Sequence, residues 1–400
     1  MKILLVNKYW YIKGGAERVV FATKKVLEDA GHEVEIFGMK HPKNIFENKY
    51  FIDNIDYGNT KGLRKIIVGI KSIYNWDAKN KFADLIDKFK PDIVHFHNIY
   101  HQLSFSLLDV VKEKKIPAVM TLHDYKMISP NYNLFNNGKI FEQSCGSNYY
   151  KCILNNCMGN FGQSVLATCE AYLRKWKKWN HNVKMYISSS NFLKEKFLSV
   201  GFVEKIEVVS NPLVDFSTEN ILVGGKNVLY MGRLSEEKGV ELVLKVAKQL
   251  LDIKFQIVGD GPLKKYLQTV IEKENIKNVE ILGYQSSDIL HNTLEKARIL
   301  IMPSQWYENC PLSVLEAHAA GKVILASNLG GLVEMVPKDM LVDHKNIEQW
   351  VSMVQNWYKK SDEELKKIGI ELRARVFNEN DLSTYYKRII KLYEKVVKSL

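Results

Sequence analysis

Two series of alternating strand and helix patterns constrain the fold of this chain more than any other feature. In the first series, the apolar run Lys2–Asn7 predicts a buried parallel strand, and Gly14 and Gly15 separate it from a helix over Glu17–Ala30 that ends at Gly31. Further strands are predicted at His32–Gly38, Asp92–His97, Ala118–Leu122 and Ile187–Ser190, with a helix at Asn191–Val200 after the last. Repeated β–α units of this kind build a parallel, doubly wound sheet.

The second series begins at the strand Asn227–Met231, after Gly224 and Gly225. Further strands are predicted at Lys254–Val258, Val279–Leu282, Ile299–Met302 and Val323–Ala326, and helices at Val240–Leu251, Leu263–Glu274, Ser287–Ala297 and Leu312–Ala320. The sequence therefore predicts an α/β protein of two Rossmann-like domains, residues 1–212 and 213–381, followed by an amphipathic helix over 382–400. Two such domains place the carboxyl ends of their strands at a shared crevice, where open α/β folds bind ligands.

The positive charge is concentrated in the first half. The chain has 400 residues and a formal net charge of +12, and residues 1–212 hold 31 Lys and Arg against 20 Asp and Glu, whereas the remainder holds 26 against 25. A field of this sign attracts nucleic acid, anionic lipid or a phosphorylated substrate. A general lysine bias is the alternative, but such a bias would enrich both halves alike.

Hydropathy suggests a cytosolic chain, and this bears on the cysteines. No apolar run approaches the length of about 18 residues that a membrane span needs, and the apolar N-terminus is too short for a signal peptide. Cys145, Cys152 and Cys157 form a cluster among five cysteines. A disulfide is improbable in the cytosol, so we expect ordinary thiols. A metal site completed by a histidine is the alternative, although the spacing matches no usual zinc pattern.

One stretch in the second series combines features of a ligand site. The strand Ile299–Met302 is followed by a short loop with Glu308, and Pro311 opens the next helix, where a missing N–H does no harm. The free amides at a helix N-terminus bind phosphate or a polarised hydroxyl. Glu316 follows two turns into the helix, so one carboxylate could face a sugar and the other a ribose. Either glutamate alone would more simply be an exposed helix charge.

Two cations and several glycine turns follow the other strands of this domain. Arg233 and Lys238 come directly after Asn227–Met231, at the carboxyl edge of the sheet, where two cations suit a diphosphate leaving group. A solvated turn would also explain them. Gly259 ends the next strand and lets a nucleotide base approach the backbone, and Tyr284 ends the strand after it and could line a base pocket.

These motifs together resemble a known family. GRLSEEKG (Gly232–Gly239), VGDGP, LGY and E-x7-E from Glu308 to Glu316 are similar to family 4 glycosyltransferases of the GT-B fold, including members that act in bacterial surface polysaccharide assembly. The resemblance implies retaining transfer from a nucleotide sugar, with no obligatory metal or other cofactor, and a C-terminal helix that crosses back to the N-terminal domain. The donor-binding residues that it implies are Gly14, Gly15, Gly232, Arg233, Lys238, Gly259, Tyr284, Glu308, Asn309, Cys310, Pro311, Leu312, Ser313 and Glu316.

The resemblance also implies roles for single residues. Arg233 and Lys238 would bind the diphosphate, Glu308 the donor sugar and Glu316 the ribose, with the amides of 309–312 on the sugar hydroxyls. Asn309 and Cys310 stand where many relatives have a glycine and an aromatic residue. The catalytic candidates are Arg233, Lys238, Glu308 and, in the first domain, His123.

In the first domain, His123 belongs to a T-x-H-D pattern that resembles the family's contact with the donor sugar. Gly14 and Gly15 resemble its N-terminal glycine loop, which would meet the donor phosphate or the acceptor hydroxyl. His95, His97 and Asn98 end the neighbouring strand and form a weaker candidate edge of the acceptor site. The long segment 125–162 is interpreted as part of the acceptor pocket, because loops of this length are usually functional.

Two basic and aromatic stretches, 61–81 and 172–184, favour an anionic membrane interface. A solvated helix face is the alternative, and nucleic acid is disfavoured because no nucleic-acid fold signature accompanies them. We therefore expect a cytoplasmic enzyme, peripheral on the inner face of the cell membrane, that moves a hexose or N-acetylhexosamine from a UDP-sugar to a lipid-linked or polysaccharide acceptor. A nucleotide-sugar epimerase and a non-catalytic nucleotide-sugar-binding protein are the alternatives. A dinucleotide oxidoreductase is disfavoured because no G-x-G-x-x-G follows either first strand.

Overall fold

The computed structural model describes residues 1–55, 63–214, 221, 224–285 and 287–398, and for 63–66 and 287–288 it describes the backbone alone. The chain divides into two compact units. Unit 1 contains Met1–Asn136, Phe141–Pro212 and Leu382–Leu400, and unit 2 contains Asn137–Ile140 and Leu213–Asp381. Among the described residues, no helix is both long enough and apolar enough to cross a membrane.

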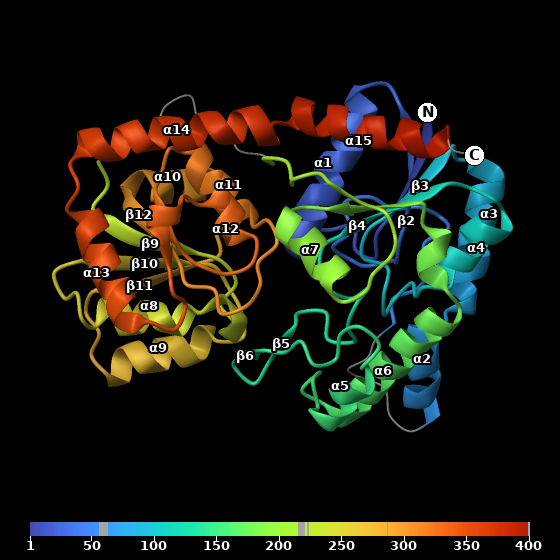
Figure 1. Cartoon of the computed structure of the whole chain (residues 1–400), viewed down its shortest axis with the longest axis horizontal. Helices are drawn as coiled ribbons and strands as arrows, with labels where there is room; N and C mark the ends of the chain where they lie inside the picture. The colour runs from blue at the N-terminus through green and yellow to red at the C-terminus, as the bar shows by residue number, and fades with distance from the viewer. Residues whose placement is uncertain (56–62, 215–220, 222–223, 286, 399–400) are drawn as a thin grey trace. The chain divides into compact units, whose positions relative to one another are not determined.

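Unit 1 is built on a parallel sheet of six strands in the order β2-β1-β3-β4-β7-β8 (Figure 1). The strands are β1 Lys2–Val6, β2 Glu33–Phe37, β3 Ile93–Phe96, β4 Ala118–Leu122, β7 Met185–Ser188 and β8 Ile206–Val208. Their side chains are buried almost without interruption in β1, β3, β4 and β7, as expected of a sheet that is covered on both faces. Two further short strands, β5 Phe135–Asn136 and β6 Lys139–Ile140, pair with each other.

The C-terminal helix belongs to unit 1. The helices of this unit are α1 Gly15–Asp29, α2 Leu63–Ile73, α3 Trp76–Phe89, α4 Leu107–Glu113, α5 Tyr150–Leu154, α6 Phe161–Trp176, the 3-10 turn η1 Trp179–Asn182, α7 Asn191–Ser199 and α15 Leu382–Val397. Helix α15 packs alongside α1 (Figure 1), and the hydroxyls of Thr23 and Tyr385 are 2.7 Å apart in this contact. The chain thus returns to unit 1 after it has completed unit 2.

Unit 2 repeats the architecture with the strand order β11-β10-β9-β12-β13-β14, again all parallel. The strands are β9 Asn227–Met231, β10 Lys254–Val258, β11 Val279–Gly283, β12 Ala297–Met302, β13 Ile324–Ser327 and β14 Leu341–Val342. The helices are η2 Glu236–Lys238, α8 Val240–Ala247, α9 Lys264–Lys273, α10 Ser287–Lys296, α11 Leu312–Ala319, α12 Leu332–Met335, η3 Lys338–Met340, α13 Ile347–Tyr358 and α14 Asp362–Asn380. One apolar core runs between the sheet and these helices.

The strand order reverses once in each sheet, between β1 and β3 in unit 1 and between β9 and β12 in unit 2. At such a point the connections leave in opposite directions, and the loops at the carboxyl ends of the two strands part to form a crevice. The sequence motifs follow these strands: Gly232–Gly239 follows β9, and the Glu308 loop follows β12. The topology therefore selects the motif-bearing loops as the ligand-binding edge of unit 2.

The cysteine prediction is wrong in one respect. Cys152 and Cys157 form a disulfide, although we expected free thiols. The pair lies at the end of the short helix α5, where Asn156 adopts a left-handed conformation and turns the chain back. Their Cα atoms are 4.8 Å apart, which suits a disulfide. Because two of the three clustered sulfurs are bonded to each other, the alternative metal site is also excluded.

Most predicted elements agree with the observed ones within a few residues. The strand expected at Ile187–Ser190 lies two residues earlier, and the helix expected at Val240–Leu251 ends at Ala247. The segment 125–162, treated as one long loop, contains β5, β6 and α5. Its disulfide and short elements give it a defined conformation that hydrophobic periodicity does not reveal.

Candidate functional site at the sheet edge of unit 2

Two loops at the strand reversal of unit 2 are joined by an ion pair. The Lys238 ammonium lies 2.7 Å from Oε1 and 2.9 Å from Oε2 of Glu308. Lys238 ends η2 in the loop after β9, and Glu308 lies in the loop after β12. The same ammonium lies 4.8 Å from the ring centroid of Trp306, within cation–π range. Two predicted catalytic residues, 70 positions apart in sequence, are therefore in direct contact.

Backbone contacts hold these two loops together. The amide of Gln305 donates to the carbonyl of Glu237 at 2.8 Å. Gly239 has a φ of +67°, and a Cβ there would lie 1.9 Å from the Pro303 carbonyl oxygen. Only glycine satisfies both the left-handed conformation and this close approach. Gly239, which ends the predicted GRLSEEKG motif, thus positions Lys238 against the second loop.

Glu308 is a buried carboxylate that is kept ionised. Burial alone would raise its pKa, but the neighbouring Lys238 charge, the hydrogen bonds from Lys238 and the hydroxyl of Ser304 outweigh it and lower the pKa below the usual value. Ser304 Oγ donates to Oε1 at 2.8 Å. The exposed fraction of the Glu308 side chain is 5%, against 22% for Lys238. The pair therefore offers its ammonium to a ligand more readily than its carboxylate.

The glycine turn after β10 has a structural role. Gly259 has a φ of +140°, and a Cβ there would lie 1.8 Å from the carbonyl oxygen of Gly232. The amide of Gly232 donates to the carbonyl of Val258 at 3.0 Å, and that of Leu234 donates to the carbonyl of Asp260 at 3.0 Å. We predicted that Gly259 admits a nucleotide base. The geometry supplies a further reason for this glycine, because it packs against the cation-bearing loop, and the approach of a base stays a prediction.

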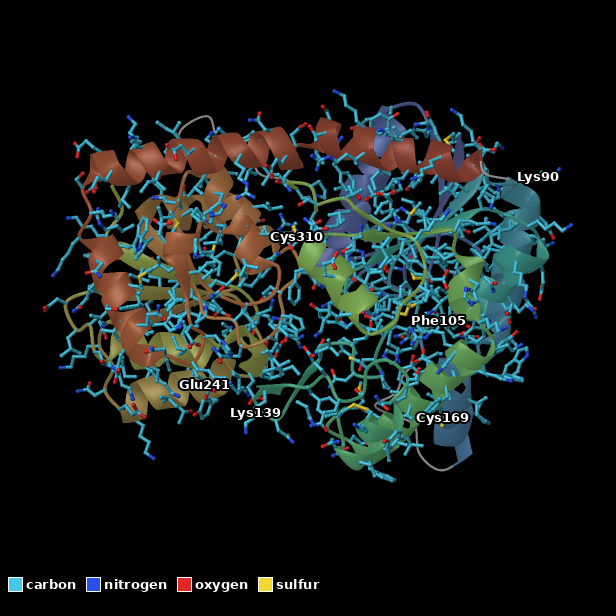
Figure 2. All side chains as sticks on the ribbon, viewed as in Figure 1. Lys90, Phe105, Lys139, Cys169, Glu241 and Cys310 are labelled. Atoms are coloured by element: carbon cyan, nitrogen blue, oxygen red, sulfur yellow. A yellow bond between two sulfur atoms is a disulfide. The ribbon has the colours of Figure 1, made fainter. Side chains whose placement is uncertain are left out.

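Helix α11 begins where the sequence indicated. Pro311 takes the N-cap position, just before the first helical residue, Leu312. We expected Pro311 at the first helical position, but its missing N–H is equally harmless one residue earlier. Cys310, labelled in Figure 2, is a buried cysteine outside the disulfide, and Ser313 is half-buried in the first turn. Glu316 lies in the same helix with only 6% of its surface exposed. The reading of Glu316 as an exposed helix charge is therefore excluded.

Sequence reasoning missed a second glycine pair in this site. Gly330 and Gly331 follow β13, and a Cβ on them would lie 2.6 Å from the carbonyl oxygen of Glu308 and 1.9 Å from that of Asn309, respectively. The amide of Gly331 donates to the carbonyl of Glu308 at 2.6 Å. These contacts fix the backbone on which the Glu308 side chain stands. The available signal was the pattern strand–Gly-Gly–helix, the same pattern that drew attention to Gly14 and Gly15.

Two predicted donor-binding side chains point into solvent. Arg233 is exposed, and its carbonyl accepts a hydrogen bond from the Tyr230 hydroxyl at 3.0 Å, which fixes the backbone beneath it. Tyr284 is 75% exposed, so in this structure it does not line an enclosed base pocket. The strand that precedes it, β11, is the edge strand of the sheet and pairs on one side only, with β10.

In unit 1, the half-buried His123 follows β4 and contacts a pair of buried histidines, His95 and His97. Its Nε2 lies 2.9 Å from Nδ1 of His97, and His95 contacts the Tyr393 hydroxyl at 2.6 Å and that of Thr121 at 2.7 Å. Burial, with the Lys8 charge second, lowers the pKa of His123 to about 4. At neutral pH His123 is therefore uncharged and suited to hydrogen bonding. Tyr393 comes from α15, so the C-terminal helix completes this group.

A second group in unit 1 was not predicted. Lys8, after β1, places its ammonium 3.9 Å from the ring centroid of Tyr100, whose hydroxyl donates to Asp124, after β4. Burial lowers the pKa of Lys8 to about 8, although the negative charges of Asp124 and Glu17 act to raise it. The positions of Lys8, Tyr100 and Asp124 in the sequence follow no recognisable motif. Only the fold brings the ends of β1, β3 and β4 together.

The predicted N-terminal glycine loop stands open. Gly14 is the N-cap residue of α1 and Gly15 its first residue, and both are exposed. A Cβ on Gly14 would come no closer than 3.8 Å to another atom, that of the Glu17 carboxylate. Space for a ligand therefore remains above this backbone. Within the part of the chain that the structure describes, no group of three His, Cys, Asp or Glu side chains is arranged to hold a metal ion.

Comparisons with known proteins agree with this arrangement. Residues 13–214 match the family model Glycosyltransferase Family 4, and residues 215–375 match Glycosyl transferases group 1. The chain is 30% identical over 356 residues to an uncharacterized 42.6 kDa protein in the cps region of Klebsiella pneumoniae, covering 84% of this chain and 87% of that protein. It is 38% identical over 129 residues to the lipopolysaccharide 1,2-N-acetylglucosaminetransferase of Salmonella typhimurium, covering 29% and 34%.

The fold is also shared with solved structures. The Anabaena protein Alr3699/HepE, crystallised with UDP and glucose, superposes with a TM-score of 0.65 at 16% identity, over 99% of this chain and 100% of that one. Two Rossmann-like units with parallel six-stranded sheets are the GT-B architecture. The matches to both family models and the Lys238–Glu308 geometry lead to one conclusion: the chain belongs to Glycosyltransferase Family 4 and is a glycosyltransferase of the GT-B fold.

Proposed function

We propose that this enzyme transfers a hexose or N-acetylhexosamine from a UDP-sugar to a lipid-linked or polysaccharide acceptor at a membrane surface, with retention of anomeric configuration. The observation that carries the proposal is the Lys238–Glu308 pair at the strand reversal of unit 2. Unit 2 would bind the donor and unit 1 the acceptor. The UDP bound to the Anabaena protein supports uridine as the base of the donor. The name of the Salmonella relative supports an N-acetylhexosamine as the transferred sugar.

The chemistry follows from the charges around the site. Cleavage of the donor leaves a nucleoside diphosphate, whose negative charge grows as the bond breaks. The Lys238 ammonium is held by Glu308, and Arg233 stands free in solvent on the same loop, so both cations can approach the diphosphate. The amides at the start of α11 add the positive end of a helix dipole. Glu308 orients Lys238, and its remaining oxygen lone pairs can accept from a sugar hydroxyl.

Glu316 completes the donor site in this proposal. It is buried just over one turn into α11 and would accept hydrogen bonds from the ribose hydroxyls. The acceptor hydroxyl would attack from the face of the leaving group, and a phosphate oxygen would take its proton. No step requires a covalent nucleophile. His123 is neutral at physiological pH and would donate a hydrogen bond to the donor sugar rather than a full proton.

Binding of the donor can be measured without knowing the acceptor. A panel of UDP-, GDP-, ADP- and dTDP-sugars is screened by thermal shift, because a ligand that binds the native state raises the unfolding temperature. We expect stabilisation by UDP-sugars. Glu316→Ala and Lys238→Ala should abolish it while the circular dichroism spectrum stays native, and Glu272→Ala, an exposed carboxylate on α9, is the matched control.

Transfer is then tested with the donor that binds. Incubation with membrane lipid or capsular oligosaccharide should yield a glycoside whose anomeric configuration, read by NMR, equals that of the donor. Inversion would contradict the retaining mechanism. Full donor binding by Lys238→Ala would contradict the assignment of the site.

A further inference from the structure

Helix α6 exposes an apolar stripe along its whole length. Phe161, Val165, Cys169, Tyr172 and Trp176 follow one another at intervals of three or four residues and therefore share one helix face. We call these five residues the α6 stripe. Phe161 is 65% exposed and Trp176 75% exposed, and Cys169, labelled in Figure 2, is an exposed thiol between them. At 1.5 Å per residue the stripe is about 22 Å long.

A neighbouring face of α6 packs into the core, so the stripe is not needed for folding. Ser164, Ala167, Thr168, Ala171 and Arg174 are buried against the body of unit 1. The helix therefore already has its core contacts, and the stripe is additional apolar surface. Monomeric proteins seldom leave an extended apolar surface in water unless it binds something.

The two helices that pack against α6 also expose apolar side chains. Helix α5 packs on α6 and carries Leu154, which is 75% exposed, beside the Cys152–Cys157 disulfide. Helix α2 lies next to α6 (Figure 1), since a Cβ on Gly69 would be 3.2 Å from the Leu166 side chain. It adds Ile67 and Ile70, which are about half exposed.

In the sequence around the stripe, almost all charged residues are positive. Between Glu142 and Glu195 the sequence contains a single acidic residue, Glu170. That residue is buried and paired with the buried Lys126, so it offers no charge to the surface. Exposed cations stand at the C-terminal end of the stripe: Lys175, Lys177, Lys178 and Lys184. A solvated helix face would carry both signs.

A small cavity opens at the same end. Its volume is about 170 Å³, and its polar lining includes Arg174, Lys175 and Lys178, together with His181, which is 2.6 Å from the Glu204 carboxylate. Arg174 is fully buried and donates to the carbonyl of Lys126 at 3.0 Å. Three basic side chains, Arg174, Lys175 and Lys178, line this cavity against one carboxylate, that of Glu204, so its net positive lining suits a phosphate group.

We propose that the α6 stripe, with Leu154 and the lysines around Trp176, docks unit 1 onto the surface of an anionic phospholipid bilayer. The apolar side chains enter the headgroup region, and the lysines pair with lipid phosphates. This inference rests on the proposed function, whose acceptor lies at a membrane, and it names the surface that holds the enzyme there. It revises the predicted stretch 172–184, because Trp179 and Arg174 are buried and only part of that stretch faces outward.

Vesicle flotation of the purified full chain tests this surface without catalysis. The probes are vesicles of phosphatidylglycerol and phosphatidylcholine in equal parts, and vesicles of phosphatidylcholine alone. We expect binding to the anionic vesicles and at least about tenfold weaker binding of the double variant F161S/W176S, since each ring loses its contact with lipid. Leu251→Ser is the matched control, because Leu251 is 74% exposed in unit 2 and should not affect flotation.

Each outcome of the flotation experiment decides the proposal. Equal binding of the double variant and the parent chain, or no binding of the parent chain to either vesicle, would overturn it, and the second result would favour a protein partner for the stripe. Equal binding to both kinds of vesicle would overturn the role of the lysines. Thermal shift with nucleotide sugars is measured on the same variants. Normal donor binding in F161S/W176S, with lost flotation, separates this surface from the donor site.

Discussion

The ammonium of Lys238 and the carboxylate of Glu308 meet at 2.7 Å and join the loops that follow β9 and β12. The two strands are neighbours at the point where the sheet of unit 2 reverses its strand order. The contact therefore has a structural role and a chemical role. It joins two loops at the sheet edge, and it holds a cation where we propose that the diphosphate binds.

Removing the cation should destabilise the protein in a pH-dependent way. Lys238→Ala leaves Glu308 as a buried carboxylate without its partner, and we expect a loss of roughly 3 kcal/mol in the free energy of unfolding at pH 7. With Lys238 present, the pKa of Glu308 is lowered, so its stabilising contribution is present above the unfolded pKa and lost as pH falls through the folded one. In the variant, burial raises that pKa instead. The difference between variant and parent should shrink as the pH falls towards 4.

Urea unfolding at several pH values measures this effect. Lys248→Ala is the control, because Lys248 and Glu274 form a 2.6 Å pair in the same unit whose side chains are both more than 40% exposed. An exposed pair should contribute at most about 1 kcal/mol. A loss of equal size in both variants would show that burial of Glu308 is not what makes the Lys238 contact strong.

Gly239→Ala should damage the donor site through the backbone. The added Cβ meets the Pro303 carbonyl oxygen at 1.9 Å and also strains a φ of +67°. Gly31→Ala separates the two effects, since Gly31 has a φ of +81° but no atom within 4 Å of its added Cβ. We expect Gly31→Ala to cost about 1 kcal/mol and Gly239→Ala clearly more.

Thermal shift with a UDP-sugar is the second measurement on this pair. Gly239→Ala should weaken donor binding, because the two loops must move apart, whereas Gly31→Ala should not. Unaltered donor binding in Gly239→Ala would mean that the contact between the two loops does not shape the site.

Loss of the disulfide should lower stability by a moderate amount. Cys152 and Cys157 are separated by five positions, and closing so short a loop stabilises the native state by about 2 kcal/mol in the chain-entropy account. The double variant C152S/C157S should show this loss in urea unfolding, and Cys169→Ser, at an exposed free thiol, should show none. Thiol titration of the unfolded, unreduced chain should find three reactive cysteines. Five would contradict the disulfide.

Acid should destabilise unit 1 through its buried histidines. Burial lowers the pKa of His95 from 6.5 to about 3, so the folded state holds it neutral while the unfolded chain takes up a proton below pH 6.5. Stability is therefore full above the unfolded pKa and is lost as pH falls towards the folded one, by about 1.4 kcal/mol per pH unit for each such histidine. His95→Gln should reduce the slope between pH 6 and pH 5 by this amount.

The matched control for this slope is His181→Gln, because the His181 side chain is 55% exposed. Equilibrium unfolding at closely spaced pH values gives both slopes. If His95→Gln leaves the slope unchanged, His95 is not held neutral by burial.

The local pattern determined most of the elements and supplied the residues that we propose for the donor site. Apolar runs bounded by glycine and proline located the strands β1, β4, β9 and β10 because a strand that is covered on both faces must be apolar at every position. Arg233, Lys238, Glu308 and Glu316 were found because the spacing of charges after a strand is a local property of the chain. The direct contact of Lys238 with Glu308 was not predicted, because it requires two loops that are 70 positions apart in sequence to meet.

What only the tertiary structure decided depends on distant packing. Four features depend on segments that are separate in sequence. They are the burial of Trp179 and Arg174, the contact of Gly330 and Gly331 with the Glu308 loop, the Lys8–Tyr100–Asp124 group and the exposed α6 stripe. A basic and aromatic stretch has the same composition whether its tryptophan lies in the core or in solvent. The neighbouring helices settle which of the two occurs, because burial depends on what packs against a side chain rather than on what precedes it in the chain.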